Sequence, residues 1–255
     1  MAAFTSAGSA WTTTAGSKTV TATPTLADLI VVIAGTSGLA GGTIDVTDNN
    51  TDGRGTYTQI HTDFTGFSTT GVLTMWVRHA LIGSATSTIF TANQTGSSGG
   101  GLQVCRISGM SICGLGAVRG AGGQSAGGAG ATPAPVLLRR VGTVFSGTQA
   151  ALTANLCLGA VANGSNPAGM TQPASWSESI DLGYTVPTTG LETAFRNSGE
   201  TGSTITWGST SATAFASMVI ELDISVPQYD YVIPGKADKE RLLYRQSAVG
   251  RSSVT

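Results

Sequence analysis

Charged residues are scarce in this sequence. Lys, Arg, Asp and Glu make up 11% of the 255 residues, against about 25% in an average soluble domain. An intrinsically disordered chain would combine high charge with few apolar residues, whereas 40% of these residues are hydrophobic and the mean hydropathy is +0.16. The net charge of −1 and the pI near 6.1 predict no basic surface for nucleic acid or an anionic membrane. We therefore expect a folded domain with no nucleic acid and no membrane as partner.

Long hydrophobic runs are missing as well. The longest apolar run, residues 29–34, is far shorter than the ~20 apolar residues that cross a bilayer as a helix. Residues 1–8 have neither the positive start nor the apolar centre of a signal peptide. We therefore expect a chain that is made and folded in a cytoplasm.

Cysteine and histidine are also few. Cys105, Cys113 and Cys157 are odd in number, irregularly spaced and without a C-x-x-C pair. In a reducing compartment such residues are usually small buried hydrophobes, so we expect three reduced thiols. A bridge between Cys105 and Cys113 would need an oxidising environment. His61 and His79 lack the spacing of a zinc site, so no zinc site is predicted.

Glycine, threonine and serine are abundant and together account for roughly two residues in every five. All three disfavour helix interiors, and runs with strand character recur between clusters of Gly, Asn, Asp and Pro. Many short strands of this kind are typical of a β-sandwich or a barrel. We predict an all-β, β-sandwich or jelly-roll-like domain over residues 1–226. Its strands are predicted at 18–22, 29–34, 43–47, 57–61, 72–79, 87–92, 102–108, 152–161, 176–182, 191–195, 203–207 and 213–224.

The last of these strands has the clearest pattern. Between residues 213 and 224, apolar side chains alternate with Ser, Glu and Asp. Successive side chains of a strand point to opposite faces of the sheet. The alternation therefore predicts a buried face made of Met218, Ile220, Leu222 and Ile224.

A glycine-rich stretch interrupts the strand pattern. Residues 114–130 include eight glycines and continue into Ala131-Thr132-Pro133-Ala134-Pro135. The glycines do not recur at every third position, which excludes a collagen helix, and no phosphate-binding lysine follows them. We interpret residues 114–135 as a long surface loop, with the alternative of a loop that orders against a neighbouring subunit, since glycine allows close backbone approach.

The C-terminal residues 227–255 differ in composition from the rest. They hold five Lys or Arg and three acidic residues, and a possible short helix spans residues 236–246. Before it, residues 229–234 form an extended strip of aromatic and aliphatic side chains. An exposed strip of this kind is a liability on a monomer, so we predict an arm that docks on a neighbouring chain; the alternative is a solvated tail. The residues expected to bind the partner are Tyr229, Tyr231, Val232, Ile233, Leu242, Leu243 and Tyr244.

A possible calcium loop begins at Asp48. Asp48, Asn50 and Asp52 followed by Gly53 match the start of an EF-hand loop, whose oxygen ligands suit Ca²⁺. The twelfth position is Gln59 where a bidentate glutamate is expected, and the flanks have strand character. A hairpin turn rich in Asn, Asp and Gly explains the same residues. We favour the turn, so that calcium stays a weak alternative and no cofactor is expected.

Catalytic motifs are not evident. Ser108 lacks the G-x-S-x-G context of a nucleophile, and the acid pairs Glu178 with Asp181 and Glu221 with Asp223 are neighbours on one strand, expected to be solvated or salt-bridged. No catalytic residues are assigned and the chain is not expected to be an enzyme. The tryptophans are interpreted as core residues, with a sugar-binding face as the alternative; they are Trp11, Trp76, Trp176 and Trp207.

Several stretches together resemble a known group of proteins. Residues 25–32, TLADLIVV, are similar to the x-x-G-D-L-L-V-V strand of β-sandwich proteins from tailed-phage virions. Residues 45–48, DVTD, and 55–58, GTYT, resemble the hairpin that follows that strand, 107–109, ISG, resembles the Y-S-G before their variable loop, and 215–223 resemble their closing strand. Such proteins serve as capsid decoration or cement proteins or as tail-fibre modules, and they generally carry no catalytic residues.

The resemblance implies a structural role in a virion. We expect a decoration (cement) protein that stabilises a phage capsid, with the major capsid protein or other virion chains as partners and with a homo-oligomeric state. A tail-fibre or receptor-binding module is the first alternative. A calcium-dependent carbohydrate-binding domain, or a glycan hydrolase, is the second.

Overall fold

The computed structural model describes thirteen stretches of the chain: residues 3–12, 16–25, 28–37, 44–49, 57–61, 64–65, 71–79, 88–94, 99–110, 114–126, 128–164, 169–185 and 188–224. These residues form sixteen strands and one short 3-10 helix, η1 (Gly114–Ala117), and no α-helix among them could cross a membrane. The predicted all-β fold is confirmed. The strands are β1 (Ala3–Thr12), β2 (Lys18–Ala22), β3 (Leu29–Ser37), β4 (Ile44–Asp48), β5 (Thr58–Gln59), β6 (Phe64–Thr65), β7 (Val72–His79), β8 (Thr88–Gln94), β9 (Gly99–Ser108), β10 (Val118–Ala126), β11 (Leu138–Val141), β12 (Val144–Thr148), β13 (Leu156–Asn163), β14 (Ser177–Thr185), β15 (Thr188–Arg196) and β16 (Phe215–Leu222).

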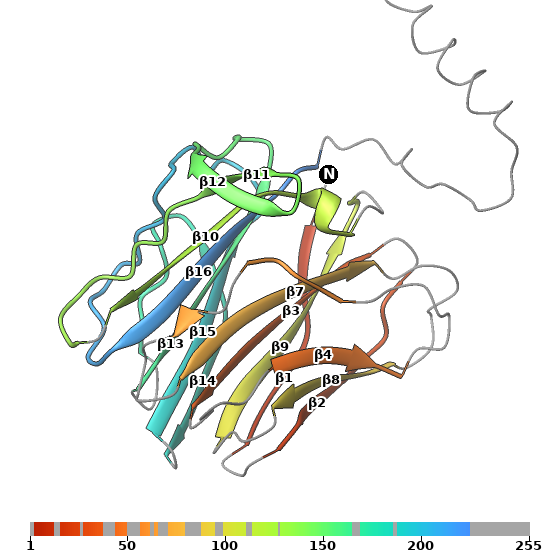
Figure 1. Cartoon of the computed structure of the whole chain (residues 1–255), viewed down its shortest axis with the longest axis vertical. Helices are drawn as coiled ribbons and strands as arrows, with labels where there is room; N and C mark the ends of the chain where they lie inside the picture. Colours follow the sequence, from red (N-terminus) through yellow and green to blue (C-terminus); the bar gives the residue numbers. More distant parts are fainter. Residues whose placement is uncertain are drawn as a thin grey trace, which may run out of the picture.

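The strands form three antiparallel sheets that stack as layers (Figure 1). Sheet A has the order β1-β9-β3-β7-β5, with β6 also paired to β7, and sheet B has the order β2-β8-β4. Sheet C has the order β12-β11-β10-β16-β13-β15-β14. Sheets A and B contain only strands from β1 to β9, and sheet C contains only strands from β10 to β16. Between β1 and β4 consecutive strands alternate between sheets A and B.

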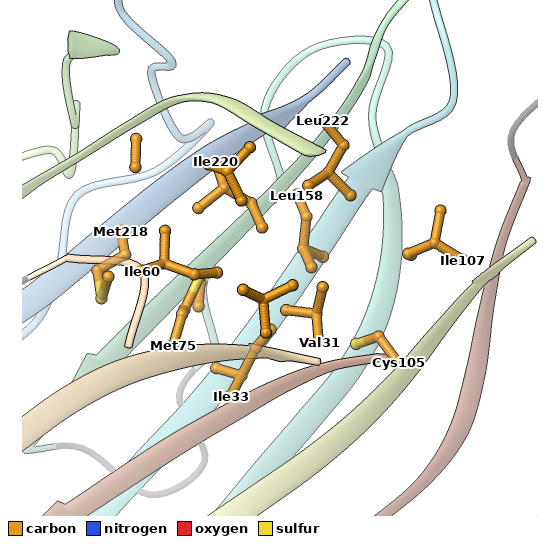
Figure 2. Packing of buried hydrophobic residues seen from close by; sticks show 14 of the residues in the cluster. Val31, Ile33, Ile60, Met75, Cys105, Ile107, Leu158, Met218, Ile220 and Leu222 are labelled. Atoms are coloured by element: carbon orange, nitrogen blue, oxygen red, sulfur yellow. The ribbon is translucent and has the colours of Figure 1, made fainter. Parts of the chain in front are cut away.

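Sheet A is the middle layer and is covered on both sides. One apolar cluster fills the space between sheets A and C (Figure 2), and a second fills the space between sheets A and B. On β3, Leu29, Val31 and Ile33 belong to the first cluster, whereas Ile30 and Val32 belong to the second. This double burial explains why residues 29–34 form a continuous apolar run instead of an alternating one.

Strand β16 confirms the predicted buried face. Met218, Ile220 and Leu222 are buried in the cluster between sheets A and C, and Ile224 packs against it. The opposite face of β16 is buried too, because Phe215 and Val219 belong to a third cluster on the outer face of sheet C. Long connecting segments cover that outer face and contribute Leu137, Ala151, Met170, Trp176, Ile205 and Trp207.

The prediction of a surface loop over residues 114–135 is wrong. Residues 118–126 form β10, which pairs with both β11 and β16 inside sheet C. The glycines are needed because the segment leading to β11 lies directly on this strand. A Cβ atom at Gly122 would lie 1.8 Å from the carbonyl oxygen of Val136. Glycine here permits close packing of two backbones. In the sequence, the same run of glycines looks like a flexible loop.

Other strand predictions meet mixed outcomes. The strands predicted at 18–22 and 72–79 have those bounds in the structure, as β2 and β7. The strand predicted at 203–207 is wrong, because that segment makes only an isolated bridge between Thr204 and Val136. Strands β1, β6, β11 and β12 were not predicted. Residues 225–255, and with them the predicted arm, lie outside the described residues.

Candidate functional site

The start of the possible calcium loop is held in an ion pair. Asp48 ends β4 and lies against Arg78 of β7, and the side chains of both are almost fully buried. The Tyr57 hydroxyl donates a hydrogen bond to Asp48 Oδ2 at 2.8 Å, and the Arg78 guanidinium lies 5.7 Å from the centre of the Tyr57 ring. These contacts join sheet B to sheet A.

Asp48 and its partners have a structural role between sheets A and B. Burial, and then the neighbouring Asp48 carboxylate, raise the pKa of Tyr57 above its usual range, so that Tyr57 stays a neutral donor. Asn50 and Asp52 lie outside the described residues. Within the described stretches, no three His, Cys, Asp or Glu side chains come close enough to hold a metal ion. The sequence did not indicate that Asp48 would pair with Arg78.

Two of the three cysteines are buried free thiols, as predicted. Cys105 is in the cluster between sheets A and C, and Cys157 is in the cluster on the outer face of sheet C. Burial raises the pKa of both thiols well above the usual value. A thiol of this kind is a poor nucleophile. Cys113 lies outside the described residues.

The tryptophans are mainly core residues, as interpreted from the sequence. Trp176 and Trp207 are buried on the outer face of sheet C, and Trp76 packs against the cluster between sheets A and B. The indole N–H of Trp176 donates to Glu200 Oε2 at 2.9 Å. Trp11, near the end of β1, differs because 50% of its surface is exposed.

Of the acid pairs in the sequence, Glu221 is a buried member of a polar network. It is fully buried on β16 and forms an ion pair with Arg119 of β10. The N–H of Leu152 and the side-chain amide of Asn155 each donate to Oε1 at 2.8 Å, and the Gln149 amide donates to Oε2 at 3.2 Å. Glu221 thus fixes the segment between β12 and β13 against sheet C. Glu178 and Asp181 are exposed on β14.

A second buried glutamate, Glu192 on β15, was not identified from the sequence. Its side chain is 1% exposed, and the N–H of Met170 donates to Oε2 at 2.8 Å. The pKa of Glu192 is raised to about 8, chiefly by burial; the Met170 N–H lowers it, and the negative charges of Asp181 and Glu178 add to the rise. Nothing in the sequence distinguishes Glu192 from the exposed Glu178, because its burial depends on the distant segment around Met170.

A perturbed carboxyl can mark an active site, but Glu192 is closed off from any substrate. Another buried polar group, Gln103 of β9, links sheets A and C: Thr193 of β15 donates to its Oε1 at 2.6 Å, and its amide donates to Ser179 of β14. These groups join layers instead of facing a cleft.

Three residues from the stretches that carry the resemblance also stabilise the fold through their contacts: Asp28, Asp48 and Tyr57. Asp28, just before β3, accepts from the N–H of Thr25 at 2.8 Å and pairs with Arg106 of β9 at 2.7 Å. Asp48 and Tyr57, from the two halves of the resembling hairpin, bond each other. The predicted partner-binding residues lie outside the described residues; they are Tyr229, Tyr231, Val232, Ile233, Leu242, Leu243 and Tyr244. No protein-family model matches the chain, and no curated protein matches it.

Proposed function

We propose that this chain is a non-enzymatic structural protein of a virion, which decorates and stabilises a phage capsid through contacts between subunits. One observation supports this proposal most. Three buried polar side chains hold separate parts of the fold together. Asp48 with Arg78 joins sheets A and B, and Gln103 with Thr193 joins sheets A and C. Glu221 holds the segment between β12 and β13 through the N–H of Leu152 and the amide of Asn155. Side chains in these roles keep a rigid surface in place and are not available for chemistry.

The packing of the layers supports the same role. Three apolar clusters lie between sheets A, B and C and under the segments that cover sheet C. Because these clusters hold the sheets together, the sheets have little freedom to move apart. A decoration protein needs a preformed surface, because ordering a mobile one on binding costs affinity. The proposed partners are the major capsid protein or other virion chains.

The attachment itself is assigned to the C-terminal arm, residues 227–255. Its aromatic and aliphatic residues offer large apolar area, at about 25 cal/mol per Å² buried. Many copies on one lattice strengthen a modest individual affinity through effective concentration. The five basic residues of the arm would fix orientation more than they add affinity.

Deletion of residues 227–255 tests this assignment. The full chain is expected to sediment with capsids that lack it, and the shortened chain is expected to stay in the supernatant. Its far-ultraviolet circular dichroism should remain that of the full chain, since the described clusters contain no residue beyond Ile224.

A triple substitution within the full chain, Tyr229→Ser, Tyr231→Ser and Ile233→Ser, provides the matched variant if the shortened chain does not fold. It should also fail to sediment with capsids. Full attachment of either folded variant would contradict the assignment of the arm.

A further inference from the structure

Nearly every sheet edge in the described residues carries a feature that discourages pairing with another chain. The edge strand β14 has the exposed acids Glu178 and Asp181 and a bulge, and β4 has the exposed Asp45. In sheet B, the charged Lys18 points inward from edge strand β2 and is only 2% exposed. Charges, inward-pointing charges and bulges are the means by which natural proteins protect their edges.

Two of the remaining three edges are protected by their size or shape. The far edge of sheet A consists of β5 and β6, with two residues each. Edge strand β12 has five residues, and Gly147 with φ of 70° interrupts its register with β11. Short strands and bulges of this type offer few successive backbone groups to a partner.

Strand β1 is the exception. It is the edge of sheet A, it has ten residues, and its sequence AFTSAGSAWT contains neither a charged residue nor a proline. A bulge separates Ser6 from Gly8, and Asn197 Oδ1 accepts a hydrogen bond from the N–H of Phe4 at 3.0 Å. Beyond the bulge, residues 8–12 pair without interruption with residues 104–100 of β9. Alternate backbone groups of an edge strand point away from the sheet. Among the described strands only β9 pairs with β1, so this half of β1 can pair with another strand.

The side chains of this half of β1 suit a second copy of the same strand. Ser9 and Trp11 are exposed, and Trp11 exposes half of its surface. Two copies of an uncharged edge meet without repulsion between like charges, which self-pairing of β14 or β4 would create. An antiparallel pair related by a two-fold axis also uses both edges at once and leaves neither open.

We propose that two copies of this chain associate through residues 8–12 of β1, as an antiparallel pair that joins their two A sheets. Pairing centred on Ala10 places Trp11 of each copy opposite Ser9 of the other, and so covers the exposed half of the indole. The proposal gives the expected homo-oligomer a defined surface. It does not rest on the capsid role, because it is tested on the isolated chain.

The test is sedimentation velocity of the full chain over a range of concentrations, together with the variant Ser9→Lys. The native chain should be in a monomer–dimer equilibrium. Each introduced lysine lies opposite Trp11 of the other copy, which makes the two lysines diagonal neighbours on one face. Their repulsion should raise the dissociation constant by roughly tenfold or more. The matched control is Ser146→Lys, because Ser146 is an exposed serine of another uncharged edge strand, β12; it should leave the equilibrium unchanged.

Hydrogen exchange of the native chain provides a second measurement that needs no substitution. Amides of residues 8–12 should exchange more slowly at high than at low protein concentration, whereas amides of β12 should not change. A chain that is monomeric at all concentrations, a dimer that Ser9→Lys does not weaken, or exchange in β1 that is independent of concentration would each overturn the proposal.

Discussion

Glu221 and Glu192 are both buried on the outer face of sheet C, but in different surroundings. Around Glu221, three side chains and one backbone N–H contribute hydrogen bonds, and one of them carries the positive charge of Arg119. Around Glu192, the Met170 N–H is the one donor, and Oε1 has no hydrogen-bond partner among the described residues. The charged groups that act on Glu192, Asp181 and Glu178, are negative.

The difference shows how the same residue type serves two purposes in one sheet. A buried carboxylate is tolerated where donors and a counter-charge replace water. Glu221 meets that condition and ties the strand β10 and the segment after β12 to β16. Glu192 does not meet it, and its pKa of about 8 means that it holds its proton at neutral pH. Glu221 therefore stabilises the fold as a charged group, whereas Glu192 is buried in its neutral form.

The largest effect is expected from Glu221→Ala. Removal of this carboxylate leaves Arg119 without its counter-charge and takes the acceptor from the N–H of Leu152 and the amide of Asn155. Breaking a buried pair in this way typically costs about 3–5 kcal/mol of the free energy of unfolding. Urea denaturation should show this loss, whereas Glu178→Ala on the exposed face of β14 should change stability by less than about 0.5 kcal/mol. Equal effects of the two substitutions would remove the distinction between the buried anchor and a surface acid.

A smaller but substantial loss of stability is expected from Gly122→Ala. Gly122 lies on β10, the strand that carries Arg119, the partner of Glu221. The new methyl group would overlap the carbonyl oxygen of Val136 at 1.8 Å, so the covering segment must move away from β10. Overpacking of this kind costs about 1–3 kcal/mol. Gly128→Ala is the matched control, since a Cβ atom at that position meets nothing within 4 Å. If the two variants melt at the same temperature, the covering segment does not rest on β10 as described.

The smallest effect, and one that depends on pH, is expected from Glu192→Gln. The folded chain keeps a proton on Glu192 up to about pH 8, whereas the unfolded chain loses it near the ordinary value of 4.5. The free energy of unfolding of the native chain should therefore fall as the pH rises between these two values. The glutamine variant should lack this part of the slope, with a stability near that of the native chain at acid pH and about 1–3 kcal/mol above it at alkaline pH.

Chemical denaturation from pH 4 to pH 9 measures this slope directly, with Glu178→Gln as the control that keeps it. A native chain and a Glu192→Gln variant with parallel stability curves would mean that Glu192 is ionised like an ordinary surface acid.

The sequence predicted the parts of the fold that depend on local pattern. Strands β2 and β7, and the buried face of β16, follow from alternation and strand-forming residues. Strand β10 could not be found in this way, because its glycines carry no side-chain pattern and its conformation is imposed by β16 and by the backbone of Val136. Strand β1 consists of Ala, Ser, Thr and Gly with two aromatic residues. It also lacks an alternating pattern of apolar and polar side chains that would predict a strand.

The polar joints were also beyond the sequence. Asp48 and Arg78 are far apart in the chain and pair because sheets A and B stack. Glu221 and Arg119 are also far apart, and they pair because β10 and β16 are neighbours in sheet C. Lys18 and Glu192 resemble surface residues in sequence and are buried only because other segments cover them. The candidate arm was predicted from its composition alone, and its residues lie outside the described part of the chain.

The central claim, that this block of sheets decorates a capsid, is tested most directly by electron microscopy of the virions that contain the chain, compared with particles made without it. The account predicts added density over the outer surface of the shell, repeated with the capsid lattice, which disappears when the chain is omitted and returns when the purified chain is added. Density confined to the tail, or particles that look the same with and without the chain, would contradict it.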